Sequence, residues 1–250
     1  MAARAAVRVG CCGFAVAQAR YFRTFDLVEV QQTFYHPPQP STLQRWRAAA
    51  PRGFEFTLKA WQLITHEPSS PTYRRLRTPI PASRHSRFGS FRCTEEVFDA
   101  WGTTLEAAHA LAASAVVFQC PASFEPSAKH VRNLRGFFRA IAGQAAGLRL
   151  CWEPRGAWPR RSVLQLCAEL GLTLTIDPFA ADPPPSGLRY FRLHGIGGYR
   201  YRYTDDDLHR LLGWCRGETY ALFNNMSMAE DAQRFQQMLD HGRPGEPVCR

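Results

Sequence analysis

Eight short apolar runs, most of them separated by amphipathic stretches, constrain the fold of this 250-residue chain more than any other feature. Short runs rich in β-branched and aromatic residues are typical of buried strands, and strands that alternate with helices predict a parallel sheet. The runs that we interpret as strands are Val7–Cys12, Phe25–Gln31, Phe54–Lys59, Ala115–Gln119, Leu148–Glu153, Leu172–Asp177, Leu188–His194 and Glu218–Asn224.

The stretches between these runs carry residues that start and stop helices. Ser41 with Gln44 matches a capping box, and Thr204, which precedes three aspartates, is a favoured N-cap residue. Pro159 suits the first turn of a helix that Gly171 ends. The chain therefore alternates strand and helix along its length.

Two parallel folds fit this alternation. A closed (β/α)₈ barrel typically takes about 250 residues, which matches this chain. An open doubly wound sheet usually carries a glycine-rich fingerprint after its first strand, and residues 10–14 lack that spacing. We therefore predict an α/β fold of the (β/α)₈ TIM-like barrel type, as a single domain over residues 1–250.

One long segment, residues 61–93, follows the third predicted strand and shows little periodicity. It contains four prolines, and Glu67 is its one acidic residue. Segments of this length without regular structure are usually functional or disordered, so we predict a basic insertion loop. Its arginines are Arg74, Arg75, Arg77, Arg84, Arg87 and Arg92.

The formal net charge is +10 and the pI is about 9.6, which favours an anionic partner such as phosphate, nucleic acid or an acidic metabolite. The alternative is the bias of a GC-rich genome, because only Lys59 and Lys129 are lysines among 31 basic residues. Both interpretations stay open, since net charge speaks to association and solubility and not to a specific ligand.

The sequence shows no signal for export or membrane insertion, which bears on the cellular compartment of the protein. Residues 1–6 are too short and too charged for a signal peptide, and no apolar run approaches the roughly 20 residues that span a bilayer. The eight cysteines form no C-x-x-C pair, and several lie inside apolar runs. We expect a cytoplasmic protein without a membrane partner, whose cysteines are small buried hydrophobes.

Polar residues stand at the carboxyl ends of strands that should otherwise be apolar on both faces. In strands, side chains alternate with period two, and the phase groups these residues on the inner side of the barrel. Active sites of such barrels lie at this end. The set is Glu29, Gln31, Lys59, Gln119, Glu153, Asp177, Arg192, His194 and Asn224.

This set has two interpretations: a functional site, or a buried ion-pair network that only fills the barrel. Buried charges are costly and often mark function, which favours a site. Glu29, Glu153, Asp177 and His194 are the candidate catalytic residues, and together with His66 they would also be the ligands of a divalent metal. Metal ligation and acid–base chemistry both stay open, and no G-x-S-x-G or P-loop motif appears.

The segment after the seventh predicted strand begins with Gly195, Gly197 and Gly198, where such barrels often bind phosphate through backbone N–H groups. Tyrosines then alternate with arginines over residues 199–203. Rings stack on bases while arginines meet phosphates, so we expect Tyr199 and Tyr203 to bind ligand. For Tyr201 we favour a structural stacking role.

Arg155 and Trp158 follow the fifth predicted strand in the stretch Glu153–Trp158. Because they stand just beyond the carboxyl end of a strand, they would lie on the rim of the barrel. Two roles stay open for both residues: binding a ligand, or capping the helix below.

Taken together, these residues resemble the YecE-like family, the domain of unknown function 72. The resemblance implies a TIM barrel, similar in fold to phosphodiester-cleaving and sugar-isomerising barrels, and no established reaction. It also adds Tyr35 to the ligand-binding residues. Many members carry Asn where this chain has Gln31, and a Trp-containing insert where it has Phe14. The matching stretches are Val28–Tyr35, Phe56–Ala60, Ile64–His66, Phe118–Pro121, Trp152–Arg155, Arg192–Gly195 and Phe223–Asn225.

The leading hypothesis is an enzyme or binding protein for a phosphate-bearing ligand, including nucleic acid, with Lys59, Arg192 and the glycine run holding the anion. A non-catalytic nucleic-acid-binding barrel would need the surface arginines and not the carboxylates. An enzyme for sugars or small acids would need the pocket but not the basic loop. We expect the pocket to gather Glu29, Lys59, Glu153, Asp177, Arg192 and His194.

Overall fold

Eight parallel strands close into a barrel in chain order in the computed structural model, which describes residues 7–241. Every predicted strand is present, with ends within two residues of those expected, and the closed barrel excludes the open doubly wound sheet. The strands are β1 Val7–Cys12, β2 Leu27–Val30, β3 Glu55–Lys59, β4 Ala115–Gln119, β5 Arg149–Glu153, β6 Thr173–Ile176, β7 Arg189–Leu193 and β8 Thr219–Phe223.

The chain divides into two compact units. The terminal unit consists of Met1–Val28 and Ile176–Arg250, and the middle unit of Glu29–Thr175. The single domain predicted over the whole chain stays a prediction, and each unit is described by itself.

The middle unit holds β3, β4 and β5 side by side, and their register pairs Lys59 with Val117 and Gln119 with Glu153. Polar residues at these strand ends therefore lie along one edge, as expected for parallel strands. The helices of this unit are α2 Gln32–Tyr35, α3 Pro40–Ala49, α4 Gln62–Thr65, α5 Glu95–Leu111, α6 Ala128–Ile141 and α7 Arg160–Leu170.

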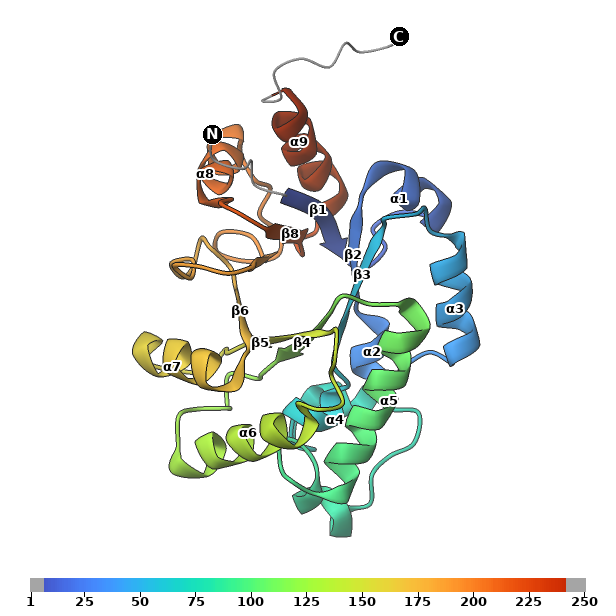
Figure 1. Cartoon of the computed structure of the whole chain (residues 1–250), viewed down its shortest axis with the longest axis vertical. Coiled ribbons are helices and arrows are strands. Elements are labelled where there is room, and N and C mark those ends of the chain that lie inside the picture. Colours follow the sequence, from blue (N-terminus) through green and yellow to red (C-terminus); the bar gives the residue numbers. More distant parts are fainter. Residues whose placement is uncertain (1–6, 242–250) are drawn as a thin grey trace. The chain divides into compact units, whose positions relative to one another are not determined.

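Helix α6 shows how the sequence builds this unit. Its apolar residues Leu134, Phe137, Phe138 and Ile141 recur at helical spacing, and all four are buried. Phe118 of β4 packs against both phenylalanines of α6. Helices α6 and α7 lie next to one another (Figure 1). Ion pairs from two arginines of α6 to a glutamate of α7 join them.

The terminal unit contains β1, β7 and β8, in which Phe223 of β8 pairs with Cys11 on one side and Leu193 on the other. Its helices are α1 Gln18–Thr24, α8 Asp205–Trp214 and α9 Met228–His241. Tyr21 of α1 is fully buried, and its hydroxyl accepts from the Cys11 amide at 2.7 Å and donates to the Leu27 carbonyl at 2.9 Å. These bonds fix α1 against the strands of the same unit.

The helix signals were largely correct. Thr204 and Asp207 form the capping box of α8, and α7 runs from Arg160 to a left-handed Gly171 at φ +65°. The capping box expected at Ser41 was wrong. Helix α3 begins at Pro40, two residues before the start that Ser41 as N-cap would give, because Pro40 has the backbone angle of a first helical turn and leaves Ser41 inside the helix.

The seven described cysteines are free thiols, and six of them are buried, as predicted for small core residues. Cys93 is exposed and departs from that prediction, while Cys249 lies outside the described residues. Burial raises the pKa of the Cys11 thiol to about 12. Among residues 7–241, no helix combines the length and apolar character that crossing a membrane requires.

Candidate functional site

The carboxyl ends of β2, β3 and β5 carry three buried charged residues in the middle unit. Glu29 is 0% exposed, Lys59 6% and Glu153 3%. The Thr33 hydroxyl, in the turn after β2, donates to the carbonyl of Lys59 at 2.6 Å, which holds the ends of β2 and β3 together. Three of the predicted site residues are therefore buried charges at strand ends, where a purely structural core would place apolar side chains.

The Lys59 ammonium group lies 3.6 Å from the centroid of the Phe34 ring, in cation–π contact. The same ring meets the His66 imidazole edge-on at 4.9 Å. Burial, and after it the positive charges of Lys59 and Arg155, lower the pKa of His66 to about 3. At neutral pH this site therefore holds a neutral imidazole among cations.

Each carboxylate of this region has a nearby donor. Glu153 Oε1 accepts from Arg155 Nε at 2.8 Å and pairs with Arg155 Nη2 at 2.6 Å. Glu29 Oε1 accepts from the side-chain amide of Gln31. The half-buried Gln119 lies beside Glu153 in the register of β4 and β5. We call Glu29, Gln31, Lys59, His66, Glu153 and Arg155 the lysine cluster.

Two aromatic residues predicted to bind ligand have structural partners. The Trp158 indole N–H donates to the carbonyl of Phe124 at 2.6 Å, and its ring packs edge-on against Trp152. These contacts support the structural interpretation of Trp158. The guanidinium group of Arg75 covers the ring of Tyr35 at 3.6 Å, so one face of that ring is occupied.

In the terminal unit, Asp177 follows β6, and its carboxylate accepts hydrogen bonds from two backbone amides. Its Oδ1 accepts from the amide of Phe179 at 3.0 Å, and its Oδ2 accepts from the amide of His194 at 2.8 Å. The His194 ring also approaches this carboxylate, with Nδ1 3.5 Å from Oδ2. Asp177 thus joins the turn after β6 to the end of β7, a structural role that the strand pattern did not predict.

Two amides of the glycine run, those of Gly195 and Gly198, have partners within the chain. The amide of Gly195 donates to the Tyr203 hydroxyl at 2.8 Å, and the amide of Gly198 donates to the carbonyl of Gly195. Gly195 has φ +87°, and a Cβ there would lie 2.3 Å from the Gly198 oxygen. These glycines therefore permit a tight turn, and the phosphate contact expected of them stays a prediction.

The ligand-binding role expected for Tyr203 stays a prediction. Its side chain is 1% exposed and packs against Phe179 and Phe223, because its ring fills the core of the terminal unit. Tyr201 has a structural partner, since its hydroxyl donates to Asp207 at 2.7 Å, and the stacking role that we favoured for its ring stays a prediction. Tyr199 is 53% exposed and stays a candidate for ligand contact.

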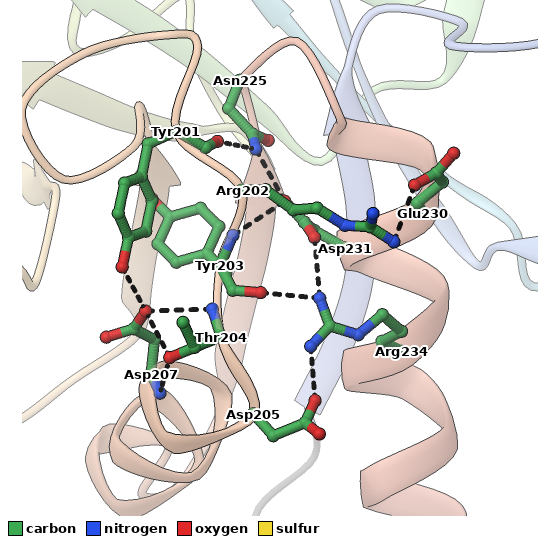
Figure 2. A network of polar contacts seen from close by, with 10 residues as sticks. All are labelled: Tyr201, Arg202, Tyr203, Thr204, Asp205, Asp207, Asn225, Glu230, Asp231 and Arg234. Carbon is green, nitrogen blue, oxygen red and sulfur yellow. Dashed lines mark hydrogen bonds and ion pairs between the residues drawn. The ribbon is translucent and has the colours of Figure 1, made fainter.

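Sequence reasoning missed the network that holds this segment (Figure 2). Asp231 of α9 is 0% exposed, and its Oδ2 accepts from the Tyr203 amide at 3.2 Å and from Asn225 Nδ2 at 2.7 Å. Arg234 Nη1 lies 3.0 Å from Asp231 Oδ1 and donates to the Tyr203 carbonyl at 2.6 Å. Only the stretch Phe223–Asn225, singled out for its family resemblance, pointed toward it.

Arg192 is 1% exposed. Asn224 is half-buried, and its backbone N–H donates to the Leu193 carbonyl at 2.8 Å. The pocket predicted to unite six charged residues spans both units: Glu29, Lys59 and Glu153 belong to the middle unit, and the other three to the terminal unit. Their convergence stays a prediction. Within the described chain, no group of three or more His, Cys, Asp or Glu residues is placed to hold a metal ion.

The basic segment predicted as a loop contains two 3₁₀ helices, η1 Pro71–Arg75 and η2 Ala82–Arg87. Most of its arginines are engaged in intramolecular contacts. Arg84 and Arg87 pair with Glu96 of α5, and Arg92 pairs with Glu67 at 2.6 Å. With Arg75 stacked on Tyr35, Arg74 and Arg77 are the loop arginines that have no ion-pair or ring partner among the residues described.

The comparisons with known proteins bear on this fold and its family. Residues 17–248 match the family described as "Protein of unknown function DUF72". The chain belongs to the DUF72 family. This confirms the resemblance drawn from the strand-end motifs. None of the curated proteins matches the chain.

Solved structures of DUF72 family proteins are similar to this chain. A DUF72 family protein from Enterococcus faecalis V583 is 21% identical, with a TM-score of 0.69 over 95% of this chain and 98% of that one. One from Thermotoga maritima MSB8 is 20% identical, with a TM-score of 0.64 over 94% and 99%. A D-psicose 3-epimerase reaches a TM-score of 0.54 at 13% identity over 92% and 93%. Likeness at these identities shows the shared barrel fold alone.

Proposed function

We propose that this DUF72 protein binds a phosphate-bearing small molecule at the lysine cluster. The observation that carries the proposal is Lys59, an ammonium group 6% exposed at the end of a strand and stacked on Phe34. Burying a cation costs free energy, so a buried lysine at the carboxyl end of a barrel strand is a functional candidate. Lysine also binds phosphate well as a point charge.

The surroundings of Lys59 support an anionic ligand. The imidazole of His66 stays neutral at physiological pH, because burial and the two nearby cations lower its pKa to about 3. A neutral His66 offers a hydrogen bond without adding a third positive charge. Arg155 is 32% exposed at its side chain, so its guanidinium group is accessible for a second contact to the phosphate.

Glu153 and Glu29 are the acid–base groups within this proposal. Arg155 contacts Glu153 Oε1 through two nitrogens, and this contact holds the carboxylate in place for the role of base that we propose. Asp177 is left out of the proposed chemistry, because both of its oxygens accept backbone amides.

Nucleic acid is the weaker candidate ligand. Four of the six arginines of the basic segment have partners within the chain, which leaves Arg74 and Arg77 as its freest cations among the described residues. Binding through two phosphate contacts would give a shallow salt dependence, with a slope of about −1.8 in log K against log salt.

A thermal-shift assay separates these ligands. Ribose 5-phosphate at about ten times its Kd should raise Tm by roughly 3–6 °C, since such binding adds about 1.4 kcal/mol and each kcal/mol shifts a chain of this size by about 2–4 °C. Unphosphorylated ribose serves as the control. A shift with a single-stranded oligonucleotide but none with ribose 5-phosphate or inorganic phosphate would contradict the proposal.

A further inference from the structure

The basic segment lines a cavity of about 270 Å³ in the middle unit, apart from the lysine cluster and partly open to solvent. None of the residues of the lysine cluster lines it. Its lining residues belong to the basic segment, residues 61–93, except His36, which follows α2. Its walls are Leu63, Leu76, Thr78, Pro79, Ile80, Pro81 and Phe88, with Arg77 and Arg84 among the lining residues.

The walls suit a flat apolar body. Phe88 and Leu63 are each 7% exposed, and the rings of Trp61, Pro79 and Pro81 offer flat faces. An apolar cavity of about 150 Å³ is large enough for benzene. The present cavity, at about 270 Å³, has room for such a ring together with a polar substituent.

The charged side chains of the lining are both arginines, Arg77 and Arg84. No acidic residue lines the cavity, and Arg77 has no carboxylate partner among the residues that the structure describes. Burial, and after it the charge of Arg77, lower the pKa of His36, so this imidazole stays neutral at physiological pH. Arg84, by contrast, is paired with Glu96 at 3.1 Å.

Trp61 adds a second observation. Its indole Nε1 is buried and has no hydrogen-bond acceptor among the described residues. A buried donor without an acceptor lowers the stability of the folded protein. An acceptor atom on a bound ligand would satisfy this N–H group. The ring of His36 meets the same indole edge-on at 6.4 Å, so both groups face the same part of the lining.

We propose that this cavity binds a small aromatic carboxylate, whose ring lies between the apolar walls and whose carboxylate is held by Arg77. Arginine is suited to this role because its planar guanidinium group binds carboxylates through two parallel hydrogen bonds. The site is independent of the phosphate site proposed above, since the two share no residue.

Isothermal titration with phenylacetate tests the proposal, with phenylacetamide as a ligand of the same shape without the charge. Phenylacetate should bind at least about tenfold more tightly, because one charge-assisted contact is worth a factor of about ten or more. Arg77→Gln should weaken phenylacetate binding by about tenfold. Arg74→Gln, a matched change on the same segment outside the cavity, should leave the affinity unchanged.

Trp61→Phe, which removes only the indole N–H and part of the ring, should also weaken phenylacetate binding, and unchanged melting curves would show that the variants fold. Three results would overturn the proposal: equal affinity for the acid and the amide, equal losses in Arg77→Gln and Arg74→Gln, or no binding of phenylacetate at millimolar concentration.

Discussion

The network around Asp231 makes one prediction whose size follows from the structure. In Asp231→Asn, the remaining side-chain oxygen can still accept from the Tyr203 amide and from Asn225. The new amide group, however, places N–H donors against the guanidinium group of Arg234, where Oδ1 now accepts at 3.0 Å (Figure 2). The change therefore removes one partner of a buried ion pair and keeps the shape of the side chain.

Breaking a buried pair in this way costs about 3–5 kcal/mol. Arg234 is 28% exposed and also pairs with Asp205, so we expect the lower end, about 3 kcal/mol. At roughly 2–4 °C per kcal/mol, Tm should fall by about 6–12 °C. Urea unfolding followed by circular dichroism measures the free energy directly.

Glu230→Gln is the matched control, one residue away in the same helix. Its pair with Arg202 has the same 3.0 Å separation, but both side chains are more than 60% exposed, so the loss should be about 0–0.5 kcal/mol. In an Arg234→Met background, Asp231→Asn should cost at least about 1 kcal/mol less than in the wild type. Equal losses in Asp231→Asn and Glu230→Gln would refute the reasoning.

Three further changes test other parts of the structure. The His66 imidazole stays neutral in the folded state down to about pH 3 but takes up a proton near pH 6.5 when unfolded, so the free energy of unfolding should fall by about 2 kcal/mol from pH 7 to pH 5. His66→Gln should lose about 2 kcal/mol less than the wild type over this range, and equal losses would contradict the burial argument. Asp177→Asn should cost about 1–3 kcal/mol in urea unfolding, because one of its two backbone amides loses its charged acceptor; no loss would mean that the carboxylate serves another role. Gly102→Ala should stabilise α5 by about 0.5–1 kcal/mol, since no neighbouring atom lies within 4 Å of the added Cβ, and a lower Tm would contradict this.

The strand positions could be predicted because each strand is a local signal. Runs such as Ala115–Gln119 are apolar throughout and bounded by helical or turn residues, so their ends were found exactly or within two residues. Burial of Lys59 and Glu153 could be predicted from the same pattern, because both residues lie in apolar runs whose strands are buried on both faces. Strand order in the barrel then followed from chain order.

Partner identity could not be predicted in this way. The alternating tyrosines look equivalent in sequence, but Tyr203 is buried and Tyr199 is 53% exposed, because only the former meets Phe223 and the α9 residues that fix its backbone. Asp231 lies 28 positions from Tyr203 along the chain, beyond the reach of any local pattern. The engagement of the loop arginines by Glu96 was hidden for the same reason.

The cavity could not be predicted from the sequence, because the prolines of the basic segment are typical of irregular structure. Pro79 and Pro81 instead line the cavity together with Trp61. A segment without periodicity can still be ordered when short 3₁₀ turns and ion pairs, such as that of Arg92 with Glu67, hold it.

The two lysines of this chain allow the most direct test of the proposed function, which rests on Lys59. Lys59 is buried at the end of β3, whereas Lys129 is exposed on α6, and replacing either by methionine removes one positive charge from the middle unit. Titration of ribose 5-phosphate by calorimetry should show a Kd at least about tenfold higher in Lys59→Met, because one charged contact is lost. Lys129→Met should bind as the wild type does. Equal affinities in the two variants, with both folded, would contradict the account.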